Sequence, residues 1–479
     1  MKTLISIFVG LTISCALYAS ATNPTTQEKR ICYSIDAENN YVTFIFDEAT
    51  WGRYPSSVYV RGSFNSWSSS ESFKLVKHSA GYWSLTKTFN EIKQPGNSGQ
   101  PEFKFYVNGN YVDAPSFVPE GYVFKNADRN QIIVFPTDDL ATIIANSNKA
   151  NTIKYLSDFD LNTIEGKEAL SNFRKVPGAA RLYRSYHPFK TSKSSVGNTE
   201  AKRMELITEF ATAVGIKSDI CLSENETGNL TSYTISGLGT FQEAIPAYYQ
   251  TIINNNNVFY VLPTSSYNAV YYRSNEAQFG IWVKDIVDFI ISDAPAPFLI
   301  HCRLGTDRTG VFSAVIEALL GVSWNEIAAD FQRSTDMGVR EFRDYHLLQY
   351  SLERMLAIDN INNITNLQAT VSEYFINNGY LTQEKIEAMN AKLNGFTALP
   401  ETNSKPLTIY PNPANKYVKI TFDGNISNVS IIQLDGKIVQ QTEYNNELVY
   451  IGNINSGLYF IQIETGNKSK YIEKLVITR

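Results

Sequence analysis

The sequence contains few cysteines, few histidines and no surplus of positive charge, and each shortage excludes a class of function. It has four cysteines and four histidines in 479 residues. His187 and His346 have no metal-ligand spacing with each other or with a cysteine, so we expect no metal and no other cofactor. The 42 basic and 47 acidic residues give a formal net charge of −5, which provides no overall positive field for a nucleic-acid backbone. Nucleic acid is therefore not an expected partner.

Long apolar runs are absent after the first segment of the chain. That segment begins with the charged Met1-Lys2, is mostly apolar from Leu4 to Leu17, and ends in Ala19-Ser20-Ala21, the small-x-small form that signal peptidase accepts. The run is shorter than the ~20 apolar residues that span a bilayer, although a membrane anchor is the alternative. We therefore predict a signal peptide at residues 1–21 and no transmembrane span.

Cleavage of that segment leaves an odd number of cysteines. Cys15 is removed with it, and Cys32, Cys221 and Cys302 remain. Three cysteines in an exported chain cannot all pair with one another, so at least one thiol is free or pairs outside the chain.

Apolar and aromatic residues are plentiful, at 43% and 13% of the sequence, which excludes global disorder and favours strand-rich structure. The length suggests about three domains at ~150 residues each. Short alternating runs predict an all-β sandwich at 28–136, with Asn108-Gly109 as a hairpin turn. A mixed helix and strand region at 150–393 predicts an α/β domain. A linker at 394–406 and a second small β-sandwich at 407–479 complete a multidomain fold.

One motif in the α/β region carries recognisable chemistry, His301-Cys302-Arg303-Leu304-Gly305-Thr306-Asp307-Arg308-Thr309-Gly310. The apolar run Phe298-Leu299-Ile300 predicts a buried strand before it, and Val311 to Leu320 predicts a helix after it. A strand, a tight loop and a helix N-terminus form an anion site, because the loop amides and the helix dipole both attract negative charge. We therefore expect this loop to favour a bound phosphate and a thiolate.

The side chains of the motif have distinct expected roles. Cys302 is the expected nucleophile, with a lowered pKa, and Arg308 is placed to clamp two phosphoryl oxygens with its planar fork. Thr309 can donate its hydroxyl to the sulfur as it leaves, and His301 is expected to fix the loop through hydrogen bonds. These roles predict two-step hydrolysis of a phosphoester through a phosphocysteine.

The pattern HCxxGxxRTG resembles the Cys-x5-Arg active-site loop of the protein tyrosine and dual-specificity phosphatases. Asn172-Phe173-Arg174 and Leu182-Tyr183-Arg184-Ser185 are similar to the first segment of atypical bacterial and fungal members. The resemblance implies a tyrosine-phosphatase-like catalytic domain that needs no cofactor. It also implies that the substrate phosphate binds to the loop residues Arg303, Leu304, Gly305, Thr306, Asp307 and Arg308.

Two departures from this family affect the expected site. Relatives often have Asp-Leu-Arg where this chain has Cys221-Leu222-Ser223, so a buried salt bridge seen there is in doubt. No Trp-Pro-Asp segment is present to supply a general acid. Asp307 is the best substitute, because some bacterial relatives have an aspartate directly before the arginine. The alternative is that Asp307 pairs with Arg308 or a lysine and holds the loop.

The first domain resembles the glycogen-binding module of kinases and glucan-processing enzymes. The similar segments are Val60 to Trp67, Trp83 and Phe103 to Gly109. By position, the residues corresponding to the sugar-contacting ones are Trp67, Lys104, Tyr111 and Asn130. Aromatic rings can stack on pyranose faces, whereas in a purely structural spacer Trp67 would pack inward. A glucan is therefore a possible partner.

The last domain resembles the C-terminal sorting domain of proteins exported by the type IX secretion system. The segments that carry this resemblance are YPNPA at 410–414 and SGLYFIQI at 456–463. An adhesive β module is the alternative. The resemblance implies that the type IX secretion machinery is a partner and that the protein is secreted or on the cell surface.

These features together predict an exported cysteine-dependent phosphatase that hydrolyses phosphomonoesters of the phosphotyrosine or inositol phosphate type. One alternative is a surface carbohydrate-binding protein whose phosphatase fold is weak or inactive. The other alternative is a phosphoglucan phosphatase. Pocket depth and the surrounding loops set the choice between these substrates, and neither follows from the sequence.

Overall fold

The computed structural model describes residues 23–478, except for 127, 194–197, 225–231, 236–238, 243, 262–265, 396–406, 423, 434–436, 445–447 and 467–469. The predicted signal peptide and all but the first two residues of the predicted linker lie outside the described residues. The chain divides into two compact units. Unit 1 comprises Met1–Gln94, Gln100–Phe124 and Asp128–Ile144, and unit 2 comprises Pro95–Gly99, Lys125–Ala127 and Ala145–Arg479.

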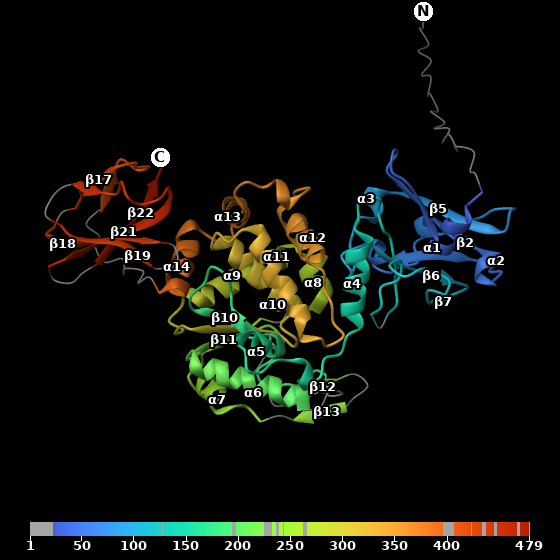
Figure 1. Ribbon diagram of the computed structural model, residues 1–479, viewed down its shortest axis with the longest axis horizontal. Coiled ribbons are helices and arrows are strands. Elements are labelled where there is room, and N and C mark those ends of the chain that lie inside the picture. The colour runs from blue at the N-terminus through green and yellow to red at the C-terminus, as the bar shows by residue number, and fades with distance from the viewer. Residues whose placement is uncertain are drawn as a thin grey trace, which may run out of the picture. The chain divides into compact units, whose positions relative to one another are not determined.

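Unit 1 is built on two four-stranded antiparallel sheets (Figure 1). The first has the order β1 (Tyr33–Asp36), β2 (Tyr41–Asp47), β5 (Tyr82–Thr88) and β4 (Val76–Lys77). In the second, β6 (Glu102–Val107) pairs with β3 (Val58–Gly62), β7 (Asn110–Val112) and β8 (Gln131–Ile132). Short helices are α1 (Thr26–Ile31), α2 (Glu48–Trp51) and α3 (Phe89–Ile92), and α4 (Leu140–Asn151) follows the last strand.

Alternating apolar residues of both sheets form one buried cluster. Phe44 contacts Phe103 with ring centroids 5.2 Å apart, and Phe46 contacts Phe105 at 5.4 Å. The β6–β7 hairpin turns at Asn108 and Gly109, whose φ angles of 48° and 84° are both positive, so the predicted turn is confirmed.

The centre of unit 2 is a five-stranded sheet. Its order is β14 (Val258–Tyr260), β11 (Ser218–Cys221), β15 (Phe298–His301), β10 (Leu182–Ser185) and β9 (Arg174–Lys175). The first four strands are parallel, and β9 is antiparallel to β10. A further pair, β12 (Ser232–Ile235) and β13 (Gly239–Gln242), is antiparallel.

Helices cover both faces of the five-stranded sheet (Figure 1). On one side lie α5 (Ile164–Ser171), α6 (Asn198–Ala213) and α7 (Ala247–Asn254). On the other lie α8 (Ser266–Tyr271), α9 (Ala277–Ile291), α10 (Asp307–Leu319), α11 (Trp324–Arg333), α12 (Tyr345–Leu356), α13 (Leu367–Asn377) and α14 (Gln383–Asn394). The helix α10 is buried from Thr309 to Leu319, because its neighbours surround it, and this fixes the loop at its N-terminus.

Pro95–Gly99 belongs to unit 2 although the segments before and after it in the chain belong to unit 1. The Asp344 amide donates to the Asn97 carbonyl at 3.0 Å, and the Tyr272 hydroxyl donates to the Pro95 carbonyl at 2.9 Å.

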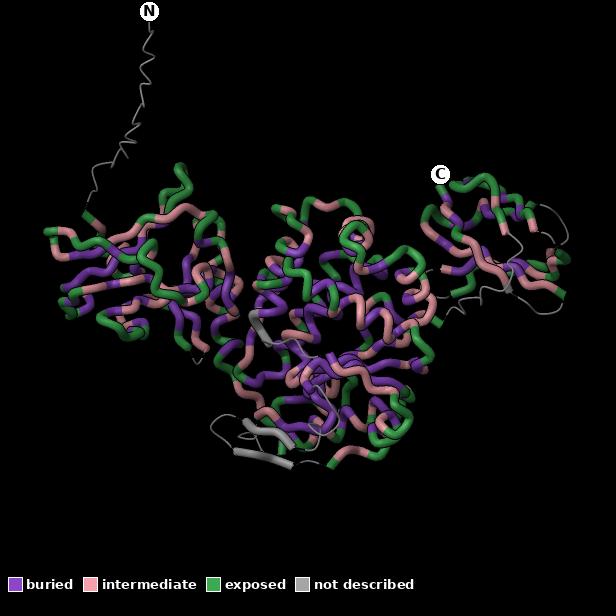
Figure 2. Tube along the Cα trace, turned by 180° about the vertical axis from the view of Figure 1, so that it is seen from behind, coloured by how far each residue is buried: buried purple, intermediate pink, exposed green. Residues whose placement is uncertain are grey.

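The last strands form two antiparallel sheets around a separate apolar cluster (Figure 2). One has the order β16 (Thr408–Tyr410), β17 (Tyr417–Thr421) and β20 (Leu448–Tyr450). The other has the order β19 (Ile438–Glu443), β18 (Ile426–Gln433), β21 (Gly457–Thr465) and β22 (Lys470–Ile477). The prediction of strand-rich regions before and after a central α/β region is therefore confirmed. Among the described helices, none has both the length and the apolar character needed to cross a bilayer.

Candidate active site

The predicted anion-binding loop connects the centre of the sheet to a buried helix. β15 ends at His301, and α10 begins at Asp307, so the loop runs from Cys302 to Thr306. Within the described residues, the backbone N–H groups of residues 304–308 donate no hydrogen bond to the protein. They lie at the N-terminus of a 13-residue helix, where the dipole also favours negative charge. The loop therefore offers a row of donors to an anion.

Cys302 lies at the start of this loop and is only 3% exposed. Burial raises the pKa of its thiol, but the Arg308 charge and the polar groups of the neighbouring Thr309 together hold that pKa below its ordinary value. The thiolate is the reactive form of cysteine, so these neighbours favour the form in which Cys302 could act as a nucleophile.

Arg308 lies in the first turn of α10 and is partly buried. Its Nη1 donates to the Leu222 carbonyl at 2.5 Å, which ties the guanidinium to the end of the neighbouring strand β11. Because the N–H groups of a guanidinium lie in its plane, the remaining N–H groups are the ones that could donate to a bound oxyanion. Arg303, in the loop itself, donates from Nε to the Ser192 hydroxyl at 3.1 Å.

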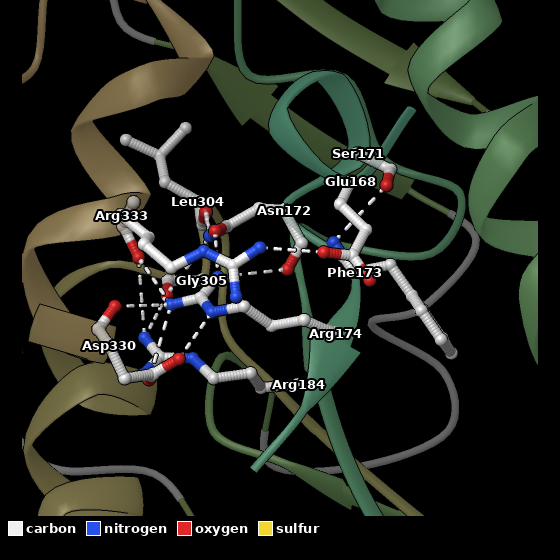
Figure 3. A network of polar contacts seen from close by, with 11 residues as sticks. Glu168, Ser171, Asn172, Phe173, Arg174, Arg184, Leu304, Gly305, Asp330 and Arg333 are labelled. Carbon is white, nitrogen blue, oxygen red and sulfur yellow. Dashed lines mark hydrogen bonds and ion pairs between the residues drawn. The ribbon is translucent and has the colours of Figure 1, made fainter. Parts of the chain in front are cut away.

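The middle of the loop requires glycine and is held by side chains from below (Figure 3). Gly305 has φ +72°, and a Cβ there would lie 2.2 Å from the Ser185 carbonyl oxygen. The Asn172 amide donates to the carbonyls of Leu304 at 3.1 Å and Gly305 at 3.3 Å. Arg184 donates to the same Gly305 carbonyl at 2.9 Å. The carbonyls of the loop are thus turned away from the anion site and held there.

A buried ion-pair network fixes Arg184 (Figure 3). Asp330 of α11 accepts from Arg184 at 2.6 Å and from Arg174 at 2.5 Å, and all three side chains are at most 4% exposed. Burial raises the pKa of Asp330, but the two guanidinium groups hold it below its ordinary value. Removing one partner of such a buried network leaves an uncompensated charge and typically costs ~3–5 kcal/mol.

His301 links the loop to a second buried network. Its Nδ1 lies 3.2 Å from the Cys302 carbonyl oxygen, and its Nε2 lies 3.1 Å from Asp219 Oδ2. The Tyr249 hydroxyl donates to the same Asp219 oxygen at 2.6 Å. Burial alone would lower the pKa of His301, but the Asp219 charge and Cys221 raise it well above its ordinary value. The predicted role of His301 in fixing the loop is consistent with these contacts.

Cys221 and Glu224 extend this network. The Cys221 thiol donates to Glu224 Oε2 at 3.1 Å, and Lys190 pairs with Glu224 Oε1 at 2.8 Å. Burial raises the pKa of Cys221. The buried salt bridge here is therefore made by Glu224 and Lys190, a pair that the sequence did not indicate. Cys32, Cys221 and Cys302 are all free thiols, as the odd count predicted for at least one.

Three of these residues have donor atoms close enough to share a metal ion. Asp219, Cys221 and His301 have ligand atoms within 4.8 Å of one another, and all three are buried. His301 and Cys221 each make a hydrogen bond to a carboxylate inside the network. The arrangement is accounted for by these bonds.

Asp307, the candidate general acid, has partners other than those expected. Its Oδ1 accepts from Arg343 Nε at 2.8 Å and from the Tyr271 hydroxyl at 3.1 Å. Arg343 Nη2 lies 3.4 Å from Oδ2. The alternative prediction was a pairing with Arg308 or a lysine, whereas the described ion pair is with Arg343.

Three of the four residues proposed for sugar contact lie on the outward side of the sheet formed by β3, β6 and β7. Tyr111 is 46% exposed, its hydroxyl donates to the Trp67 carbonyl at 3.1 Å, and the two rings are 6.5 Å apart. Lys104 pairs with Asp113 at 2.8 Å. Asn130 is only 6% exposed and donates to Glu102 at 2.8 Å, so it is occupied inside the domain.

Comparison with known proteins assigns two parts of the chain. Residues 179–395 match the model of the tyrosine phosphatase family, and this part is therefore a cysteine-based phosphatase domain. Residues 408–478 match the model of the secretion system C-terminal sorting domain, which indicates secretion or a place on the cell surface. The predicted resemblances of these two parts are confirmed.

Among solved structures, the chain is similar to the core catalytic domain of the PP-IP phosphatase SIW14 from S. cerevisiae in complex with citrate. The identity is 15%, the match covers 47% of this chain and 94% of that chain, and the TM-score is 0.24. No curated protein matches the chain.

The residues that hold the loop were largely missed by the sequence prediction. Asn172, Arg174 and Arg184 were noted only as part of a similar segment, and Asp219, Asp330 and Arg343 were not noted. Asp219 and Asp330 each lie far along the chain from the residue they pair with, and neither stands in a recognisable motif. One local signal could have indicated a buried role: Asp219 is a charged residue directly before the apolar run that starts at Ile220.

Proposed function

We propose that this protein is an exported phosphatase that hydrolyses phosphomonoesters of the phosphotyrosine or inositol phosphate type through a phosphocysteine. The observation that carries the proposal is the geometry of the loop: Cys302 lies at its start, Arg308 lies in the first turn of the helix that follows, and the amides of 304–308 are available to an anion. The sorting domain supports the proposed export. Residues 1–21, as a signal peptide, would direct the chain across the first membrane.

In the first step the Cys302 thiolate attacks the phosphorus of the bound ester, and the bond between phosphorus and the leaving oxygen breaks. Arg308 and the amides of 304–308 hold the phosphoryl oxygens as charge shifts onto them. The protonated carboxyl of Asp307 gives its proton to the leaving oxygen, so that an alcohol or phenol departs. A phosphocysteine and an Asp307 carboxylate remain.

In the second step water attacks the phosphocysteine. The Asp307 carboxylate takes a proton from this water, the sulfur–phosphorus bond breaks, and inorganic phosphate forms. Thr309 stabilises the departing thiolate, because its hydroxyl is buried, has no hydrogen-bond partner among the described residues and is free to donate to the sulfur. The nucleophile and the acid are thereby regenerated.

Phosphate release by the purified mature chain tests this function. The substrates are a small aryl phosphate, a phosphotyrosine peptide, an inositol phosphate and a phosphorylated glucan. We expect hydrolysis by the wild type and a loss of at least ~10³-fold in Cys302→Ser and in Arg308→Ala, because the two residues act as a unit. Retained hydrolysis in Cys302→Ser would falsify the mechanism, and the preferred substrate decides between the ester classes.

A second candidate function is favoured by the outward face of the β3–β6–β7 sheet. There the Arg61 guanidinium lies 3.5 Å from the Tyr106 ring centroid and 5.0 Å from that of Tyr111. Aromatic rings beside Lys104 and Arg61 offer both stacking surfaces and hydrogen-bond donors to a sugar. We propose that this face binds a glucan and places the phosphatase near its substrate.

A further inference from the structure

We infer that Tyr271 and Arg343 are positioning residues for Asp307, and that Oδ2 is the oxygen from which Asp307 transfers its proton. The inference deepens the proposed function and rests on it. It begins from the unequal surroundings of the two carboxyl oxygens. Oδ1 accepts two hydrogen bonds, from Arg343 Nε at 2.8 Å and the Tyr271 hydroxyl at 3.1 Å. Among the residues that the structure describes, Oδ2 has only the longer 3.4 Å contact with Arg343 Nη2.

This asymmetry decides where a proton can reside. A protonated carboxyl carries its hydrogen on one oxygen, and the other oxygen remains the better acceptor. Two donors directed at Oδ1 therefore leave Oδ2 as the oxygen that holds the proton. The same arrangement fixes the plane of the carboxyl, so that Oδ2 returns to one place when it must accept a proton from water.

Both donors come from elements outside the loop and are themselves held in place. Tyr271 is fully buried at the end of α8, and its ring lies 6.4 Å from that of Phe331. The carbonyl of the preceding Val270 accepts from the Ser351 hydroxyl at 2.7 Å, which ties α8 to α12. A buried phenol fixed at both backbone and ring is a rigid donor.

Arg343 lies just before α12, and its contacts leave the guanidinium little freedom. Its Nη1 donates to Glu341 Oε2 at 3.0 Å and to the Phe342 carbonyl at 2.9 Å. Its own carbonyl accepts from Gln332 at 3.2 Å. The Arg343 charge is balanced by Glu341 as well as by Asp307, so its fork is set before substrate arrives.

The test is a leaving-group series of aryl phosphates hydrolysed by the full mature chain. We expect Tyr271→Phe and Arg343→Lys each to lower kcat about 10-fold for esters with poor leaving groups, since these need the proton. For the best leaving group the change should stay within about twofold. Combining either change with Asp307→Asn should add almost nothing to the effect of Asp307→Asn alone, because all three act through one proton transfer.

Arg273→Lys is the matched control, because Arg273 is exposed, pairs with Glu276, and lies two residues from Tyr271. It should leave the whole series unchanged. If Asp307→Asn does not steepen the leaving-group dependence, the acid role of Asp307 and this inference both fail. If Asp307→Asn steepens it and the other two variants do not, or if they slow all esters equally, the positioning role is wrong while the proposed function stands.

Discussion

At the scale of single residues, the site depends on opposing effects on one sulfur atom. Burial disfavours the Cys302 thiolate, while Arg308 and Thr309 favour it, and the favourable effects are larger. In the other two thiols burial is the largest effect, and it is not offset by the hydrogen bonds to Cys32 or by the charge of His301 beside Cys221. Burial raises the pKa of Cys32 to about 12 and raises that of Cys221 as well. We therefore expect Cys302 to ionise at a lower pH than Cys32 and Cys221.

This contrast predicts the pH dependence of alkylation. Because Arg308 lowers the pKa of Cys302, Arg308→Ala should raise it, and the midpoint of inactivation by iodoacetamide should move to higher pH. Peptide mapping should locate the label on Cys302 and not on Cys32 or Cys221. A midpoint unchanged in Arg308→Ala would show that another group sets the pKa, and Arg273→Ala serves as a control for loss of an exposed charge.

The candidate reactive residues could be proposed from the sequence because they lie within ten consecutive positions, 301–310, and their types have few other uses together. Their supports could not. His301 pairs with Asp219 across 82 positions and Arg184 pairs with Asp330 across 146. Such pairs arise from the packing of strands and helices, and nothing in the local pattern distinguishes these acids from solvent-exposed ones.

At the scale of elements, the loop between β15 and α10 keeps its shape because the segment packed against it leaves no room for a different loop conformation. The Ser185 carbonyl and Asn172 meet the position where a Gly305 Cβ would be. The strand and helix that border the loop were predicted from apolar runs, since the strand and the part of the helix from Thr309 to Leu319 are buried. The clamp by Asn172 and Arg184 depends on the order of strands in the sheet, which the pattern does not reveal.

Gly305→Ala tests this steric constraint. A Cβ 2.2 Å from the Ser185 carbonyl oxygen must displace the loop, so we expect at least a ~10²-fold loss of kcat/KM and ~1–3 kcal/mol of stability. Gly379→Ala is the matched control. Gly379 has nearly the same φ, +71°, but nothing within 4 Å of its Cβ position, so it should cost ~1–2 kcal/mol with normal activity. Thermal unfolding and steady-state kinetics of both variants measure the difference, and equal activities would contradict the clamp.

At the scale of the whole molecule, the chain combines a phosphatase domain with strand-rich regions on both sides of it in the sequence. The last of these is explained by its match to a sorting domain. The first is unexplained by catalysis, and its outward aromatic face is the feature that most resembles a binding surface. The resemblance to a glycogen-binding module indicated residues of that face by position, whereas the burial of Asn130 against Glu102 did not follow from it.

Affinity electrophoresis of the full mature chain in gels with and without glycogen tests this face. We expect retardation of the wild type, and Trp67→Ala should weaken binding by ~1–3 kcal/mol through loss of an aromatic contact. Tyr54→Ala is the control, because Tyr54 is 78% exposed and belongs to the same unit but not to the face. Identical mobility of the wild type in both gels would assign the region a spacer role.

The placement of Pro95–Gly99 bears on how freely this protein could be cut or recombined. A catalytic fragment beginning at residue 150 would lack the Asn97 carbonyl that accepts from the Asp344 amide and the Pro95 carbonyl that accepts from Tyr272. Asp344 and Tyr272 are the immediate neighbours of Arg343 and Tyr271. A gene fusion that replaced the first domain together with Pro95–Gly99 would therefore remove part of the support for Asp307, the proposed acid. The phosphatase domain therefore cannot be transferred to another protein as one continuous segment, because Pro95–Gly99 belongs to the same unit.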